Sequence, residues 1–515
     1  MTSHFKALFV VIVITLAVFV LAKPLFTQFM RAEDYDRRRN TWLALTLVAF
    51  LIPNYWAYAA VAIAVIGYAV SKEPNPSALY LFLLLALPPL SLDIPTFGVV
   101  NALFALDHYR MLSLVLLLPA AVRLRRTSRT PAANLLQEPS RIGWVLTDIL
   151  IVSYAVLQVA LLMPYVSSTS VARGIVLLVL DVLLPYFVIS RGCRSRENIV
   201  ETMASFALAA MVLAPMAVFE FFKSWLLFAS LEETWRAMPL HSYLSRGGFL
   251  RATVTMGHSI MLGYAMAIAI GFWFYLQTRV DARVWRWLCL LVLLMGSTAA
   301  MARGPWVGTV AVGVVFLATG LNVGRRMMKG VVLLAVLGGV AAASPWGGKI
   351  IEFLPFVGTI DEGTVVYREQ IASASWVLIQ QHPLFGSPFF MAQMENFRQG
   401  EGIIDLVNVY ASVALVYGLG GLGLFIGFFA VAGLKCFAVV RRFANEDPDF
   451  SQMGSSLLAC MVGALVIIAT VSNYLIVPYL YWSLGALIVA YVQLAKESAV
   501  APTELPTWNL HLRAR

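Results

Sequence analysis

Long apolar runs constrain this chain more than any other feature of its sequence. A helix needs about 20 apolar residues to cross the hydrocarbon core of a bilayer. Runs near that length lie at 6–22, 41–52, 55–70, 77–90, 107–122, 144–163, 171–190, 200–222, 257–277, 284–302, 304–322, 329–343, 408–434, 455–472 and 478–495. Pro53-Asn54 either separates the second and third runs or interrupts one long helix. We predict an all-α fold, a polytopic transmembrane bundle of about 12–15 spans.

The composition supports a membrane protein. Of 515 residues, 60% are hydrophobic and 12% are charged, whereas a soluble domain carries about 25% charged residues. The net charge of +10 comes from Lys and Arg in short loops, as the positive-inside rule requires. No polybasic run is interleaved with exposed aromatic residues, so nucleic-acid binding is not expected. The four cysteines lie in apolar runs or basic loops and imply no disulfide framework.

Basic loops predict the orientation. Lys and Arg cluster at 123–126, 191–196, 279–286, 325–329 and 435–442, and such loops favour the cytoplasm. The two longest polar segments are then external. The predicted parts are N-terminal helices at 1–143, central helices at 144–343 with an external loop at 223–256, a large external loop at 344–407, C-terminal helices at 408–495 and a cytoplasmic tail at 496–515.

The segment from Ser344 to Val407 is the longest polar interruption. Loops of this length are usually functional or disordered, and its many aromatic residues favour a folded cap, because disordered segments are poor in them. A periodic stretch after Arg368 predicts a helix that ends at His382-Pro383. We expect this cap and the smaller loop around Arg246 to His258 to cover an active site.

Three external arginines are candidates for anion binding. Arg303 opens an apolar run and is followed by Gly304-Pro305, so it either snorkels to the interface or holds an anion at a helix start. Arg246 and Arg251 precede His258. They are either a second anion contact or part of a solvated loop with a satisfied histidine.

Two residues of the large loop are candidates for a general base. His382 either takes a proton or is a helix C-terminal residue favoured by the dipole. Asp405 either caps the next helix or accepts a proton from a hydroxyl nucleophile.

Other polar residues have mainly structural interpretations. Glu220 and Lys223 have the spacing of a helical ion pair. Asp181 lies in an apolar run, where it needs a partner. Asp107, His108 and Arg110 open the fifth run and are weaker candidates for lining the same cavity.

The sequence predicts neither a metal site nor a cofactor. It has no paired histidines at metal-ligand spacing and no Cys/His group. It also has no Walker loop and no GxGxxG on the predicted cytoplasmic side. These absences disfavour a metal-dependent glycosyltransferase and nucleotide-driven work.

Several motifs together resemble the O-antigen ligase and polysaccharide polymerase superfamily. They are the two arginine-bearing segments, Arg303-Gly304-Pro305-Trp306, His382-Pro383-Leu384-Phe385-Gly386, and Asn408 followed by Gly418-Leu419-Gly420-Gly421. The resemblance is strong over about 240–430 and loose before it. It implies a GT-C-like, metal-independent transferase that uses undecaprenyl-diphosphate-linked oligosaccharide at the periplasmic face of the bacterial inner membrane.

The resemblance also implies roles for residues. Arg251 and Arg303 match the family's arginines, which hold the diphosphate. Arg246, His258, Arg368 and Asn408 are expected to contact substrate, and His382 or Asp405 to activate the acceptor. The ligases carry histidine immediately before the position of Asn408, where this chain has Val407. Since valine takes no proton, the departure favours the polymerase branch.

The expected function is therefore polymerisation of lipid-linked repeat units in exopolysaccharide or O-antigen synthesis. One alternative is a ligase that transfers O-antigen to a lipid A-core acceptor. Another is a flippase or transporter, in which the same arginines bind diphosphate without cleaving it. Expected partners are the lipid-linked oligosaccharide, membrane lipid and a protein that regulates chain length.

Overall fold

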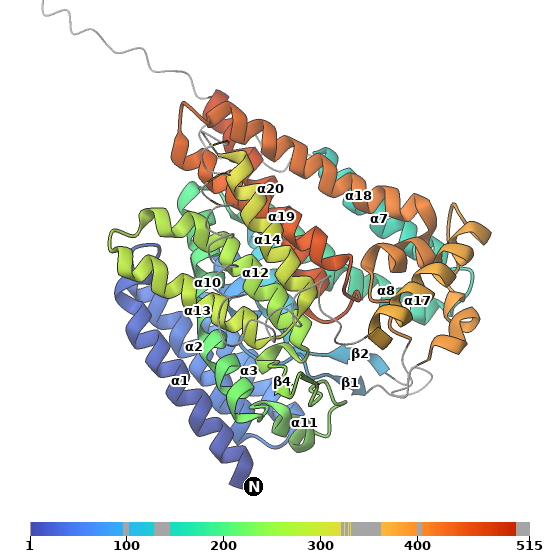
Figure 1. Ribbon diagram of the computed structural model, residues 1–515, viewed down its shortest axis with the longest axis horizontal. Helices are drawn as coiled ribbons and strands as arrows, with labels where there is room; N and C mark the ends of the chain where they lie inside the picture. Colours follow the sequence, from blue (N-terminus) through green and yellow to red (C-terminus); the bar gives the residue numbers. More distant parts are fainter. Residues whose placement is uncertain are drawn as a thin grey trace, which may run out of the picture.

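A computed structural model describes residues 2–95, 102–127, 145–320, 362–398 and 404–500, with residues 324, 328 and 330. Most are helical, and the helices pack into one bundle (Figure 1). Within these residues, seven helices are long and apolar enough to cross a membrane. They are Ser3–Phe26, Ser168–Gly192, Arg196–Lys223, Ser259–Arg279, Val409–Phe443, Pro448–Ile468 and Ile476–Glu497. The chain is a multi-pass helical membrane protein, as the apolar runs predict.

The helices follow the predicted runs closely. The N-terminal part has α1 (Thr2–Phe26), α2 (Ala32–Leu51), α3 (Tyr55–Ser71), α4 (Pro76–Leu83), the antiparallel strands β1 (Leu92–Pro95) and β2 (Ala102–Leu106), α5 (His108–Leu112) and α6 (Leu118–Thr127). The central part has α7 (Leu146–Leu162), α8 (Ser168–Leu178), α9 (Leu184–Gly192), α10 (Arg196–Lys223), α11 (Ala229–Trp235), the antiparallel β3 (Ser245–Arg246) and β4 (Phe249–Leu250), α12 (Ser259–Leu276), α13 (Arg283–Ala299) and α14 (Arg303–Thr319). The C-terminal part has α17 (Glu362–Gln381), α18 (Val409–Phe443), α19 (Pro448–Ile468) and α20 (Ile476–Val500).

Three of the predicted runs have a more specific outcome. Asn54 caps α3 by accepting a hydrogen bond from the amide of Ala57 at 3.0 Å, so Pro53-Asn54 separates two helices. The run at 77–90 is only partly helical, because α4 ends at Leu83 and two prolines follow at 88 and 89. The run at 329–343 lies outside the described residues except for residue 330.

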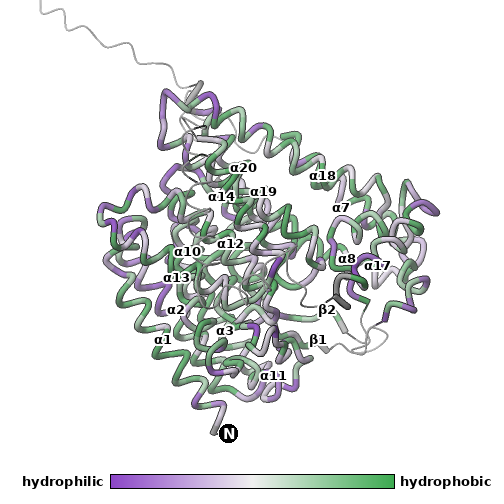
Figure 2. Tube along the Cα trace, viewed as in Figure 1, coloured by the Kyte–Doolittle hydropathy of each residue, from purple (hydrophilic) through white to green (hydrophobic). Residues whose placement is uncertain are grey.

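Polar and charged residues gather at both ends of the bundle (Figure 2). Hydrophobic residues cover most of each helix, and hydrophilic ones are more frequent toward the ends (Figure 2). At one end Arg196, the first residue of α10, pairs with Asp447 at 2.6 Å. At the other end of α10 lies the segment that contains Arg246 and Arg251. The segment of Arg246 and Arg251 thus lies at the end of α10 opposite Arg196; which end faces the cytoplasm stays a prediction.

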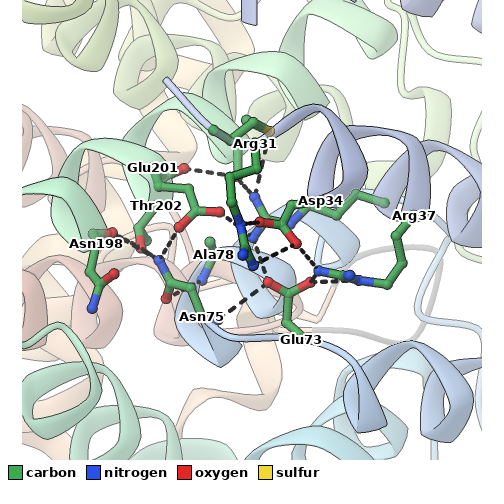
Figure 3. Close-up of polar contacts among 12 residues, drawn as sticks. Arg31, Asp34, Arg37, Glu73, Asn75, Ala78, Asn198, Glu201 and Thr202 are labelled. Carbon is green, nitrogen blue, oxygen red and sulfur yellow. Dashed lines mark hydrogen bonds and ion pairs between the residues drawn. The ribbon is translucent and has the colours of Figure 1, made fainter. Parts of the chain in front are cut away.

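A buried arginine joins the N-terminal helices to α10. Arg38 lies inside α2 and is 0% exposed. Its guanidinium donates to Glu73 at 2.6 Å, Glu201 at 2.7 Å and Ser205 at 2.8 Å. Asn75 donates to the other oxygen of Glu201 at 2.9 Å, and Figure 3 shows Glu73, Asn75 and Glu201 converging. A buried charge needs close counter-charges, so these bonds fix α2, the α3–α4 connection and α10 relative to one another.

The cap is folded, as its aromatic residues predict. α17 ends directly before His382-Pro383, and apolar residues of the cap pack against the first turns of α18. The members of this cluster are Ile371, Ile379, Phe390, Met394, Ile404, Leu406, Ala414 and Leu415. Residues 344–361 and 399–403 of the predicted loop lie outside the described residues.

The turn after α17 is inserted into a break in α18. The helix is interrupted at Gly418, whose φ is 66°. Three backbone hydrogen bonds cross the contact: Ser387 N to Leu415 O at 2.8 Å, Leu419 N to Pro383 O at 2.7 Å, and Gly420 N to Leu384 O at 3.1 Å. A Cβ on Gly386 would lie 2.5 Å from the carbonyl oxygen of Leu415. The cap thus satisfies backbone groups that a helix break would otherwise leave open in a membrane protein.

We predict that Arg38→Ala strongly destabilises the protein. The change removes the arginine that pairs with Glu201 and one of the two arginines that pair with the buried Glu73. Breaking such a buried pair costs about 3–5 kcal/mol. Thermal unfolding of the purified protein in detergent, followed by size-exclusion chromatography, measures the effect. The control is Arg39→Ala on the same helix, which removes a partly exposed pair with Asp36 and should cost at most about 1 kcal/mol. Equal losses in the two variants would contradict a special role for the buried network.

Candidate functional site

The start of α14 forms the floor of the candidate site. The helix begins at Arg303, as predicted, and Ala302 provides no side-chain cap. A Cβ on Gly304 would collide with the hydroxyl of Thr470, so glycine allows α14 to approach the end of α19 closely. The positive end of the helix dipole therefore lies beside the Arg303 side chain, which favours an anion at this position.

Two buried carboxylates position the loop after α10. Glu220, 0% exposed, accepts hydrogen bonds from the amides of Leu227 at 2.8 Å and of Thr253 and Val254 at 2.9 Å. The predicted Glu220–Lys223 pair is therefore wrong: the carboxylate binds backbone amides across the loop. Glu232, which is also buried, accepts from the amide and ring of His241.

This loop places two arginines against the α13–α14 junction. Arg246 lies on β3 and donates from Nη1 to the carbonyl oxygen of Met301 at 2.7 Å. The amide of Arg251 donates to the carbonyl of Leu244 at 2.9 Å, which closes the hairpin. The side chain of Arg246 and the backbone amide of Arg251 are thus both fixed by contacts with backbone carbonyls. This differs from the alternative of a solvated loop without fixed contacts.

Four arginines from three segments line one cavity of about 230 Å³. The lining residues are Leu244, Ser245, Arg246, Arg251, Ile260, Ala302, Arg303, Gly304, Pro305, Arg368 and Thr470. Arg368 comes from α17 and is exposed over much of its surface. Its pKa is lowered by partial desolvation; Asp405 raises it, and Arg246 and Arg303 lower it. Arg246 and Arg303 thus act electrostatically on Arg368, and Asp405 acts on it in the opposite direction.

Ser472, in the connection between α19 and α20, holds the Asp405 carboxylate near the arginines. Oδ1 of Asp405 accepts hydrogen bonds from the hydroxyl of Ser472 and from the amide of Val407 at 3.2 Å. The Val407 amide also donates to the Ser472 hydroxyl at 3.0 Å. Ser472 was not identified from the sequence; its only signal is the polar break between the runs 455–472 and 478–495.

His258 contributes a neutral imidazole. It caps α12, where Nδ1 accepts from the amide of Ile260 at 3.2 Å. The pKa of His258 is lowered to about 4, mainly by burial and also by Arg251, while Asp405 acts in the opposite direction. At neutral pH the ring is uncharged. Because Nδ1 is an acceptor, the proton lies on Nε2, so His258 can donate a hydrogen bond there.

Six non-glycine residues of the described chain have left-handed backbone; Ser224 and Arg236 lie elsewhere, and four lie close in sequence to segments of the site. Val254, Met301, Val407 and Leu475 all have φ between 47° and 51°. A β-branched residue in the left-handed region is a genuine outlier, and such strain of about 1–3 kcal/mol per residue is typical of functional sites. Val254 lies three residues after Arg251, Met301 two before Arg303, Val407 two after Asp405, and Leu475 three after Ser472.

An apolar groove of about 540 Å³ lies beside the cavity. It runs between the outer ends of α10, α13 and α14 and is lined by Val218, Phe221, Phe222, Leu294, Met295, Ser297, Thr298, Ala299, Met301, Trp306 and Thr309. Met301 connects the two spaces, because it lines the groove while its carbonyl binds Arg246. A ligand with an anionic head and an apolar tail therefore fits the combined shape.

The structure separates His382 from the other predicted residues. It is exposed beyond the end of α17 and does not line the cavity. Fourteen residues separate it from Arg368, which corresponds to about 20 Å along a helix axis. The exposed position favours the alternative role of His382 at the end of the cap helix; whether it acts as a base stays a prediction.

Asn408 has a structural role as the cap of α18. Its side chain accepts from the amide of Ala411 at 3.1 Å. This contact excludes the alternative that Asp405 caps this helix. Asp405 acts electrostatically on Arg368 and His258, which places its carboxylate close to the arginine cavity.

The weaker candidates of the N-terminal half lie elsewhere. Arg110 pairs with Asp181 at 3.0 Å, which supplies the partner that Asp181 requires in an apolar run. Asp107 caps α5, and His108 bonds the carbonyl of Leu83 at 2.7 Å. None of these residues lines the arginine cavity.

Among the described residues, no group of His, Cys, Asp or Glu is arranged to hold a metal ion. Two Asp-x-Asp sequences do occur, at 34–36 and 447–449. Their carboxylates pair with arginines or lysine outside the cavity. They form ion pairs rather than a metal site.

Comparisons with known proteins identify no relative. No family model matches the sequence, and no curated protein matches it. The resemblance to the O-antigen ligase and polymerase superfamily therefore stays a prediction from motifs.

We predict that His258 makes stability depend on pH below neutrality. Its folded-state pKa of about 4 lies below its ordinary value, so the unfolded chain binds a proton first as the pH falls. Stability is then fully present above about pH 6.5 and declines toward pH 4. His258→Asn keeps a capping side chain and removes this titration. The unfolding temperatures of the two proteins should agree at pH 8 and diverge by pH 4.5, with the wild type losing more; parallel curves would contradict the assignment.

Proposed function

We propose that the chain is a metal-independent membrane glycosyltransferase acting on undecaprenyl-diphosphate-linked oligosaccharide at the external face, most simply as a repeat-unit polymerase. The observation that carries the proposal is the cavity lined by Arg246, Arg251, Arg303 and Arg368 at one end of the bundle. Guanidinium groups bind phosphate oxygens in a bidentate manner. The adjoining apolar groove suits the first isoprenoid units of the lipid.

The proposed reaction transfers a glycosyl group from diphosphate to a hydroxyl. The acceptor oxygen forms a bond to the anomeric carbon as the bond from that carbon to the diphosphate oxygen breaks. The departing undecaprenyl diphosphate takes the bonding electrons, and the arginines stabilise the charge that develops on it. Asp405 takes the proton of the acceptor hydroxyl, and Ser472 holds the carboxylate in place.

A flippase is the alternative from another functional class. It requires a path for the head group across the whole bilayer. Beneath the cavity, 83% of the α10 span and 89% of the α12 span are buried in the protein, which favours a one-sided site. The ligase alternative shares all of the proposed chemistry and differs only in the acceptor.

The decisive experiment supplies the purified protein with undecaprenyl-diphosphate repeat units. A ladder of longer lipid-linked products indicates a polymerase. Product formed only when lipid A-core is added indicates a ligase. Movement of intact substrate between vesicle leaflets, without new products, indicates a flippase and rules out the proposal.

We predict that Arg303→Ala lowers the transferase rate about a hundredfold while the protein still accumulates. Loss of a charged contact to the leaving group costs about 3 kcal/mol in the transition state. Arg303→Lys should recover only part of the rate, because an ammonium keeps the charge but loses the bidentate geometry. An arginine that merely snorkels would give a different result: full activity with Lys, and less protein rather than less activity with Ala.

The carboxylate and histidine variants separate the two candidate bases. Asp405→Asn should lower kcat by about 10²–10⁴-fold, the usual contribution of general acid–base catalysis, with little change in donor binding. His382→Asn, on the exposed end of the cap, serves as the matched control and should retain the wild-type rate. Product formation from radiolabelled donor gives both rates. The reverse order would return the base to His382.

A further inference from the structure

The far end of the cap has an exposed apolar surface. Its six members, each more than half exposed, are Met163, Tyr165, Leu384, Phe385, Phe389 and Met391. Three belong to the segment directly after α17, Met391 belongs to the 3-10 helix Phe390–Phe397 that follows, and two belong to the connection between α7 and α8. The ring of Tyr165 meets that of Phe389 edge-on at 5.2 Å, so the two segments form one surface.

The surface is uncharged as well as apolar. From Pro383 to Met394 the sequence contains no Asp, Glu, Lys, Arg or His, although the predicted external loop as a whole is acidic. Exposed apolar surfaces of this kind mark contact with a protein, a ligand or a membrane. The absence of charge leaves nothing to steer or orient a polar partner.

The position of the surface favours lipid. Met163 directly follows α7 and Tyr165 precedes α8, two apolar helices that end together here. The ends of membrane helices mark the boundary between hydrocarbon and water, where tyrosine is enriched. Because Phe389 packs against Tyr165, the cap surface lies at this same level, at the side of the bundle next to α8 and α17 (Figure 1).

We propose that this surface, the cap anchor, is embedded in the head-group region of the leaflet on the side of the arginine cavity. The turn that contains Phe385 and Phe389 is then held twice, by the backbone contacts with the break in α18 and by the bilayer. α17 is a helix of 20 residues, about 30 Å long, with its anchored end at one side and Arg368 near the other. The bilayer thereby helps to fix the height of Arg368 over the cavity.

Site-directed spin labelling tests the cap anchor without any assay of the proposed chemistry. The native cysteines are all buried, so a single introduced cysteine can be labelled selectively in the full-length protein reconstituted into lipid nanodiscs. Labels go at Phe385→Cys and Phe389→Cys, and separately at Leu384→Cys and Met391→Cys in case a lost ring disturbs the turn. The matched control is Ser373→Cys, exposed on α17 on the same helical face as Glu369.

The expected result is that oxygen relaxes the labels on the anchor more strongly than a water-soluble nickel chelate does. Their depth should be about 5–10 Å, as for side chains inserted at an interface. At Ser373 the nickel chelate should dominate. Dominance of the nickel chelate at all four anchor positions in nanodiscs overturns the proposal. Protection that appears only with added oligosaccharide, or only as protein concentration rises, also overturns it and assigns the surface to a saccharide or to a second copy.

Discussion

Two carboxylates of α10, Glu201 near its start and the fully buried Glu220 near its end, connect this helix to the rest of the architecture. Near its first turns, Glu201 bonds the fully buried Arg38 of α2. At its last turn, Glu220 collects three backbone amides from the loop that contains the site arginines. Such charges are tolerated inside a membrane protein only with complete sets of partners. The helix therefore fixes the N-terminal helices and the loop that contains Arg246 and Arg251 relative to one another.

The arginine cavity turns this frame into a binding site. Four guanidinium groups around about 230 Å³ repel one another, and bringing them together requires rigid supports. Those supports are backbone contacts: the Arg246–Met301 bond, the β3–β4 hairpin and the start of α14. An anion bound between the guanidinium groups reduces their mutual repulsion, and a ligand with several charged oxygens reduces it most. Under the proposed function, this is the physical reason why a diphosphate would be favoured over a single carboxylate.

The sequence predicts the helices well and the site only in outline. Apolar runs locate spans directly because hydrophobicity is local, and the starts of α12, α14 and α18 fall within two residues of the predicted runs. Their charge in predicted external segments indicates Arg246, Arg251 and Arg303 as candidates, and Arg368 is expected to contact substrate. Their convergence depends on tertiary contacts that no local pattern shows. The same holds for Ser472, and for Arg38, whose partners lie 35 and 163 residues away.

One motif has a structural role that its sequence does not reveal. His382-Pro383-Leu384-Phe385-Gly386 resembles a catalytic loop, yet its backbone fills the break at Gly418, and each glycine is required by the close approach of the other chain segment. A histidine in such a turn attracts a catalytic interpretation from sequence alone. The backbone contacts show that the motif connects the cap to α18.

The absence of histidine at position 407 has a structural counterpart. Val407 has a φ of 49°, a conformation that valine adopts at a cost and that histidine tolerates better. The chain stabilises it here through the Val407 amide, which donates to both Ser472 and Asp405. These bonds direct the Asp405 carboxylate to the edge of the cavity, two residues from the place where the resembled ligases have their imidazole. In our proposal the proton acceptor is therefore Asp405, two residues before position 407, and the amide of the strained Val407 holds its carboxylate in position.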